Sequence, residues 1–213
     1  MKLFVLGASG GVGRQLVRLA CDGGHDVTAL ARRSEGIDGR ARTLIDDVLR
    51  PDCLLEKLGS CDVVISALGI KRANPLNPWS RLVSAPDFTE AAAARIVAAM
   101  KHHGIRRVIA VSAAGVADSA PRMNRLMKFL VAASNVGVAY RDLARMERVY
   151  AESGLDWCCP RPTRLTDGPL THRVAISESF PMWAAISRSD VAWWMLSRAE
   201  VSFEFRTPII TRT

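Results

Sequence analysis

The chain has 213 residues and a net charge of +8, from 29 Lys and Arg against 21 Asp and Glu. Hydrophobic residues make up 49% and charged residues 23%, which is average globular usage and excludes a disordered chain. No apolar run approaches the roughly 18 residues that span a bilayer, so we expect no integral membrane association. The first apolar run breaks at Gly7, too early for a signal peptide, and we therefore expect a cytoplasmic protein.

The net positive charge could indicate a nucleic-acid partner, but its scattered distribution favours an ordinary solvated surface, and the cysteines are not spaced as metal ligands. Arg dominates the basic residues, and no block of five like charges occurs, so we interpret the excess as a solvated surface and expect no nucleic-acid partner. The five Cys include no CxxC pair, and Cys158 and Cys159 are adjacent within an apolar run. We interpret them as buried apolar residues and expect no metal site.

Strand and helix patterns alternate along the chain. We expect strands at Lys2–Leu6, Asp26–Ala31, Thr43–Ile45, Asp62–Ala67, Arg107–Ser112 and Asp156–Cys159, and one or two more within Ser202–Ile210. We expect helices at Val12–Cys21, Pro51–Leu58, Phe88–His103, Pro121–Ala133, Asp142–Glu152 and Ser189–Arg198, the last capped by Ser189. This alternation predicts an α/β fold with a doubly wound, mostly parallel sheet in a single domain, 1–213. Loops at about 70–87, 113–135 and 163–188 are expected to cover the carboxyl edge of that sheet.

A glycine-rich turn joins the first strand to the first helix. Its sequence, Gly7-Ala8-Ser9-Gly10-Gly11-Val12-Gly13, has the spacing GxxGxxG between a buried strand and an amphipathic helix. In that context the glycines permit a sharp turn, a close approach of a diphosphate to backbone N–H groups, and tight packing of helix on strand. The alternative is a plain strand–helix turn. We favour a Rossmann-like dinucleotide site.

The residues after the second strand indicate which dinucleotide is preferred. NAD-selective sites place Asp or Glu there, whereas this chain has Arg32 and Arg33, which can grip a 2′-phosphate. We therefore expect NADP(H) to be preferred over NAD(H); the alternative is two ordinary surface arginines. Asp47, after the third strand, is the better candidate for the adenine amino group, with a turn or capping role as its alternative.

Together these residues resemble the atypical short-chain dehydrogenase/reductases. The resemblance is strongest to the NAD(P)H-binding subgroup that includes biliverdin reductase B (flavin reductase) and NmrA-like proteins. It rests on Gly7–Gly13, Arg32–Arg33, Asp47–Val48, Ser66–Gly69, Val111–Gly115, Glu152–Trp157, Arg161–Pro162, Leu165–Pro169 and Ile186–Ala192.

The resemblance implies a role for each matching position. Those implied to cradle the diphosphate are Gly7, Ser9, Gly10, Gly11 and Val12, and those implied to bind the 2′-phosphate are Arg32 and Arg33. The adenine is bordered by Asp47 with Val48, and the ribose by Ala67, Leu68 and Gly69. Ser112 and Pro162 are implied to lie beside the nicotinamide.

The catalytic groups of ordinary short-chain dehydrogenases are missing. The Tyr-x-x-x-Lys pair is absent, since Ala144 and Gly154 stand four residues after the two tyrosines. Glu147 stands where the biliverdin reductase B type has a His. Ser112 is the remaining candidate catalytic residue, either bonding a substrate carbonyl or the carboxamide or, alternatively, satisfying local backbone. We expect hydride transfer to a small, flat, conjugated acceptor such as a flavin or quinone.

Two further interpretations remain open. One is a non-catalytic, NmrA-like redox sensor or partner-binding protein. The other concerns the amphipathic segment 122–130, which we interpret as a lid or core helix, with a homodimer contact or a membrane-surface helix as its alternatives.

Overall fold

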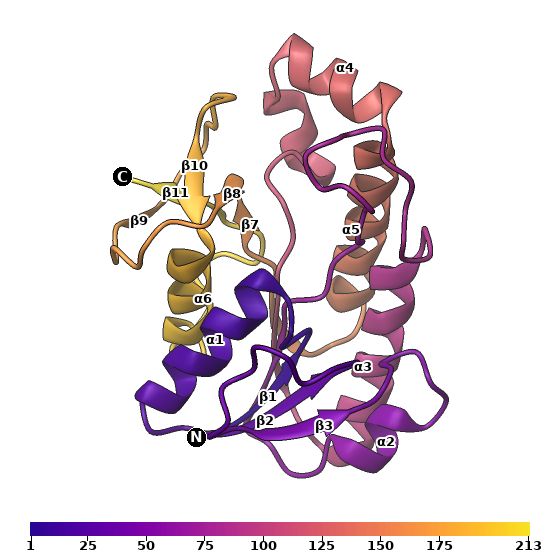
Figure 1. Cartoon of the computed structure of the whole chain (residues 1–213), viewed down its shortest axis with the longest axis vertical. Helices are drawn as coiled ribbons and strands as arrows, with labels where there is room; N and C mark the ends of the chain where they lie inside the picture. The colour runs from indigo at the N-terminus through magenta and orange to yellow at the C-terminus, as the bar shows by residue number, and fades with distance from the viewer.

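A six-stranded parallel sheet forms the centre of the computed structural model, which describes all residues 1–213 (Figure 1). Its strands are β1 (Lys2–Leu6), β2 (Asp26–Ala31), β3 (Arg42–Ile45), β4 (Val63–Ser66), β5 (Arg107–Ala110) and β6 (Asp156–Cys158). They lie in the order β3-β2-β1-β4-β5-β6, and every neighbouring pair is parallel. The strand order reverses between β1 and β4, which is therefore the topological switch point of the sheet. The predicted doubly wound α/β fold is confirmed.

Helices cover both faces of this sheet. One face carries α1 (Gly11–Asp22) and α6 (Arg188–Ser197), and the other carries α2 (Cys53–Lys57), α3 (Phe88–His103) and α5 (Asn135–Ala151) (Figure 1). Alternate residues of β1 serve the two layers: Leu3 and Val5 pack in the core under α1 and α6, whereas Phe4 and Leu6 pack in the core under α3 and α5. Burial on both faces explains why the strands are continuous apolar runs.

A small lobe of short strands stands above the carboxyl end of the sheet on the α6 side (Figure 1). It contains β7 (Arg161–Pro162), β8 (Arg164–Thr166), β9 (Val174–Ile176), β10 (Ala185–Ser187) and β11 (Ile209–Arg212), paired in the orders β7-β11-β9 and β10-β8. Of these strands only β11 was expected, and it was placed within Ser202–Ile210 rather than at Ile209–Arg212. Strands of two or three residues are too short to show an alternating pattern, so sequence periodicity missed them.

Three predicted helix boundaries are wrong. The helix expected at Pro121–Ala133 is divided into the 3-10 helix η1 (Ala117–Arg122) and α4 (Arg125–Ala133), because Met123 is extended and Asn124 caps α4. The helix expected from Asp142 begins at Asn135, where Ser134 caps it. The cap of α6 is Ser187 rather than Ser189, and its hydroxyl accepts from the Asp190 N–H at 2.9 Å.

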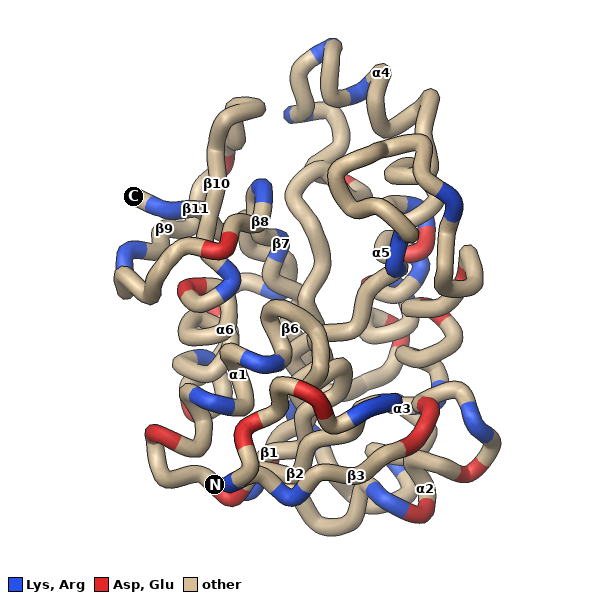
Figure 2. The backbone as a smooth tube through the Cα atoms, viewed as in Figure 1, with Lys and Arg blue, Asp and Glu red and all other residues tan.

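The three loop segments expected over the carboxyl edge lie in the upper part of Figure 1. Segment 70–87 is tied to the α4–α5 junction, where Trp79 Nε1 donates to the Ala133 carbonyl at 2.9 Å and Asn135 Nδ2 donates to the Trp79 carbonyl at 3.2 Å. Lys and Arg are dispersed over the visible face of the molecule (Figure 2). No helix has the length and apolar character that a membrane span requires.

Candidate active site

The glycine turn places the amino end of α1 against the exit of β4. Gly7 has φ +73°, and a Cβ there would lie 2.8 Å from the Ala67 carbonyl oxygen, so this position demands glycine and brings segment 67–69 beside the turn. A Cβ at Gly13 would overlap the Gly7 carbonyl oxygen, so α1 packs directly on the turn. The predicted steric roles of these two glycines are confirmed. The first turn of α1 contains no acidic residue and no side-chain cap.

Arg32 and Arg33 leave the end of β2 as exposed side chains. Neither takes part in an ion pair or a side-chain hydrogen bond, whereas Arg40 in the same loop is bound by both Asp22 and Asp38 at 2.7 Å. No carboxylate neutralises the two arginines, and both are free to bind an anion. Their positive charge is what the sequence predicted for a 2′-phosphate site.

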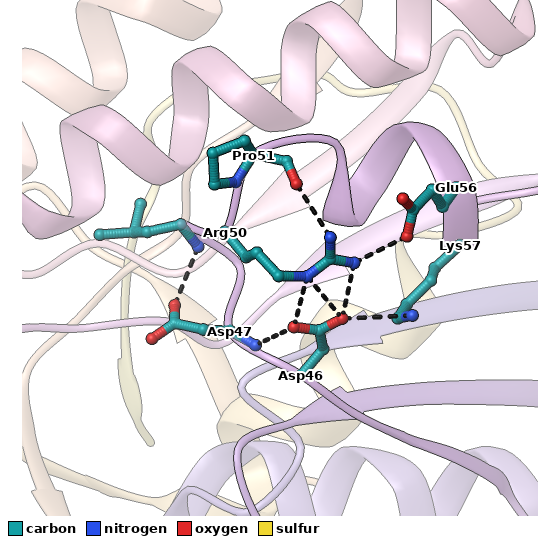
Figure 3. Close-up of polar contacts among 7 residues, drawn as sticks. Asp46, Asp47, Arg50, Pro51, Glu56 and Lys57 are labelled. Carbon is teal, nitrogen blue, oxygen red and sulfur yellow. Dashed lines mark hydrogen bonds and ion pairs between the residues drawn. The ribbon is translucent and has the colours of Figure 1, made fainter.

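Two adjacent aspartates follow β3, and the structure separates their roles (Figure 3). Asp46 accepts hydrogen bonds from the Arg50 guanidinium and pairs with Lys57 at 3.2 Å; the Arg50 bonds hold the pKa of this carboxyl well below its ordinary value. Asp47 uses one oxygen to accept from the Leu49 N–H at 2.9 Å, which is the predicted turn role. Its other oxygen makes no hydrogen bond, so only Asp47 retains an acceptor for a ligand.

Ser112 lies on the chain leaving β5, where it is held by the segment that follows β6. Its N–H donates to the Pro160 carbonyl at 2.8 Å, and the Ala114 N–H donates to the Pro162 carbonyl at 3.0 Å. The side chains of Ser112 and Pro162 thus come from neighbouring strand ends, and both residues are buried. The structure brings together the two positions that the resemblance assigns to one ring.

A buried ion pair controls the hydroxyl of Ser112. Ser112 Oγ donates to Glu147 Oε1 at 2.6 Å, and Arg161 binds both oxygens of Glu147 through Nε at 2.9 Å and Nη2 at 2.6 Å. The Arg161 side chain is 2% exposed and that of Glu147 is 6% exposed. Burial alone would lower the pKa of Arg161, but its hydrogen bonds to Glu147 and to Asp118 outweigh burial and raise it. Asp118 Oδ1, in η1, pairs with Arg161 Nη1 at 2.7 Å, and because Asp118 is exposed this ion pair extends the network to the surface.

Sequence reasoning noted Glu147 only as a departure from a family pattern, and Arg161 only as part of a motif. Nothing in the local sequence pairs a residue of α5 with one of β7, since their partnership exists only after the sheet and α5 pack together.

Tyr140 supplies the second hydroxyl of this region. Its Oη donates to the Ala114 carbonyl at 3.1 Å, and burial raises the pKa of the phenol while the charge of nearby Arg72 opposes that rise. Arg72 belongs to segment 70–87, so this loop lies near Tyr140. Sequence reasoning considered Tyr140 only to exclude a Tyr-x-x-x-Lys pair.

The carboxyl edge of the sheet therefore carries the glycine turn, two unpaired arginines after β2, and the buried Ser112–Glu147–Arg161 network after β5 and β6. Residues 7–200 match the model of a family described as NAD(P)H-binding. The chain belongs to this NAD(P)H-binding family. The resemblance to atypical short-chain dehydrogenase/reductases is thereby confirmed, and NAD(P)H is the cofactor class that the description of the family names.

Similar proteins extend this comparison. A 3-diazoavenalumate denitrifying reductase from a Streptomyces species is 28% identical over 161 residues, which are 73% of this chain and 53% of that protein. The chain thus spans about half the length of this curated relative. ChuY, an anaerobillin reductase from Escherichia coli O157:H7, is 22% identical with a TM-score of 0.80, covering 100% of this chain and 97% of its own. The oxidoreductase ylbE from Lactococcus lactis is 17% identical with a TM-score of 0.79, covering 100% and 91%. The two structures share the fold with this chain.

Proposed function

We propose that this protein is an NADPH-dependent reductase that passes hydride to a flat, conjugated acceptor such as a flavin or a quinone. Membership of the NAD(P)H-binding family and the reductase names of similar proteins support an NAD(P)H-dependent oxidoreductase. When bound, the nicotinamide supplies the hydride. The kind of acceptor follows from whether the side chains beside the nicotinamide can donate a proton to it.

The observation that carries the proposal is the commitment of both nearby hydroxyl protons. Ser112 donates its proton to Glu147, and Tyr140 donates its proton to the Ala114 carbonyl. A hydroxyl has a single O–H, so neither group can donate to a substrate without giving up its present bond. A reaction that needs a proton from a side chain, such as reduction of an isolated ketone, is therefore disfavoured at this site.

A conjugated acceptor removes the need for that proton. Hydride from bound NADPH would reduce such an acceptor by two electrons and leave NADP⁺. The negative charge would be delocalised over the acceptor's conjugated ring, so solvent could supply the proton. Proximity and alignment of two flat rings then contribute most of the rate. The chain's task is to hold one ring, admit the other, and exclude excess water.

Ser112 is proposed to hold the nicotinamide end as an acceptor. Because Glu147 takes its proton, the lone pairs of Ser112 Oγ are available to the carboxamide N–H₂. Glu147 acts as a positioning residue, and Arg161 in turn fixes both of its oxygens. The earlier alternative, donation by Ser112 to a substrate carbonyl, conflicts with this arrangement.

The remaining cofactor contacts are proposed from the placement of the predicted residues. Backbone groups of Ser9, Gly10, Gly11 and Val12 would bind the diphosphate at the amino end of α1. The free oxygen of Asp47, beside Val48, would accept from the adenine amino group, and segment 67–69 would border the ribose. Pro162 would contact the nicotinamide ring from the strand end beside Ser112.

Preference for NADPH is supported by Arg32 and Arg33, which carry two unneutralised charges at the end of β2. The double variant Arg32→Ala/Arg33→Ala should raise the Kd for NADPH roughly 10- to 100-fold, as expected for lost charge-assisted bonds, and leave the Kd for NADH nearly unchanged. Isothermal titration with both cofactors measures this. Equal losses for the two would exclude a role in reading the 2′-phosphate.

Turnover is tested by following NADPH absorbance after mixing the protein with NADPH and FMN, against a protein-free control. Consumption well above the control supports the reductase. No consumption, with NADPH binding confirmed by its fluorescence, would favour the non-catalytic sensor. Ser112→Ala should reduce turnover only moderately, and complete loss would refute transfer without a side-chain proton. The cytoplasmic location and the homodimer stay predictions, for fractionation and light scattering respectively.

A further inference from the structure

Arg188, the first residue of α6, lies across the first residue of α1. A Cβ at Gly11 would lie 2.5 Å from Arg188 Cδ and 2.8 Å from Nε, with the guanidinium carbon at 3.8 Å. The side chain therefore occupies the space that any other residue at position 11 would fill. Gly11 was predicted to be glycine for the sake of a diphosphate, but its immediate neighbour is this cation.

A cation beside the amino end of α1 is electrostatically unfavourable unless an anion binds between the cation and the helix. Unpaired N–H groups and the helix dipole give this end a partial positive charge. No acidic residue stands in the first turn, and the cap Gly10 has no side chain to accept a bond. Arg188 therefore adds positive charge to a helix end that is already positive, and both lack a buried anionic partner.

The present partner of Arg188 is weakly held. Arg188 Nη1 pairs with Asp167 Oδ1 at 2.7 Å, but the Asp167 side chain is 90% exposed, and exposed pairs of this kind contribute little stability. Asp167 and Gly11 both line an open cavity of about 420 Å³, together with Arg14 and Gly36. The Arg188 side chain itself is 30% exposed, so an anion can reach the guanidinium from solvent and replace this carboxylate.

We propose that Arg188 is a further diphosphate-binding residue, whose guanidinium leaves Asp167 and binds phosphate oxygens at the amino end of α1. The ligand class is the diphosphate bridge shared by NADPH and NADH. This contact would join the lobe of β8 and β10 to the bound cofactor, since Arg188 directly follows β10. The proposal rests on the NAD(P)H binding of the family and is independent of the acceptor.

The test measures Kd by isothermal titration for NADPH and NADH with four variants. Arg188→Ala should weaken both cofactors by the same factor, roughly 10- to 100-fold, because both carry the diphosphate. Arg188→Lys, which keeps the charge and most of the stem, should retain most of the affinity. Asp167→Asn should bind at least as tightly as the wild type. Arg95→Ala removes an exposed arginine of α3, on the other face of the sheet, and should change neither Kd.

Four outcomes would overturn the proposal. Unchanged binding by Arg188→Ala would exclude the contact, and loss confined to NADPH would assign Arg188 to the 2′-phosphate instead. An equal loss in Asp167→Asn would show that the ion pair merely holds the lobe in place. Thermal unfolding of each variant identifies any loss of cofactor affinity that comes from misfolding. If Arg188→Ala is misfolded, Arg188→Lys decides the question. An Arg188→Lys protein with wild-type stability but with affinity as low as that of Arg188→Ala would refute the assignment.

Discussion

Removing the carboxylate of Glu147 should destabilise the protein far more than removing an exposed carboxylate. Glu147→Ala deletes the acceptor of one Ser112 bond and two Arg161 bonds, and leaves the 2%-exposed guanidinium with Asp118 alone. Breaking a buried pair from one side costs about 3–5 kcal/mol, and the surviving Asp118 contact favours the lower end. For a chain of this length, about 3 kcal/mol lowers Tm by roughly 6–12 °C.

Urea unfolding at pH 7 measures this loss as a lower midpoint with an unchanged m value. The matched control is Asp22→Ala, which removes a half-exposed partner of Arg18 and Arg40 and should cost less than about 1 kcal/mol. Glu147→Leu combined with Arg161→Met should cost less than the sum of the two single changes, because no buried charge is left alone. A Glu147→Ala loss no larger than that of Asp22→Ala would refute the reasoning.

Three further predictions concern Tyr150, Asp190 and the cysteines. Tyr150 Oη is buried without a hydrogen-bond partner, so Tyr150→Phe should leave the free energy of unfolding unchanged or raise it by about 1 kcal/mol in urea melts; a clear loss would reveal an unseen partner. Asp190 accepts bonds from Thr171, Ser187 and the His172 N–H; burial alone would raise its pKa, but these bonds lower it. Its contribution is therefore present above the ordinary Asp pKa of about 4 and lost as pH falls further, so the destabilisation by Asp190→Asn should shrink between pH 7 and pH 3. Burial raises the pKa of Cys61 and of Cys158 to about 12, and it also raises the pKa of the other three thiols. A thiol reagent at pH 8 should therefore label the native protein slowly and should label all five cysteines after unfolding. Rapid labelling of the native protein would contradict this.

The sheet and its helices were predictable because their signals are local. Each central strand is a buried run bounded by turn residues, and α3 was predicted from Phe88 to His103 with its true limits. The small lobe and the division of the 121–133 segment were not, since strands of two to four residues and two extended residues, Met123 and Asn124, leave no periodic signal.

The sequence by itself determined the glycine turn, the order of strands and helices, and the charges after β2. These depend on neighbouring residues: a positive φ at Gly7 and helix packing at Gly13 are properties of one short segment. Only the tertiary structure decided what Ser112 does with its proton and where Arg188 lies. Glu147 comes to Ser112 from α5, 35 residues away, and Arg188 comes to Gly11 from the far end of the chain. Such pairings follow from how helices pack on the sheet, which no local pattern records.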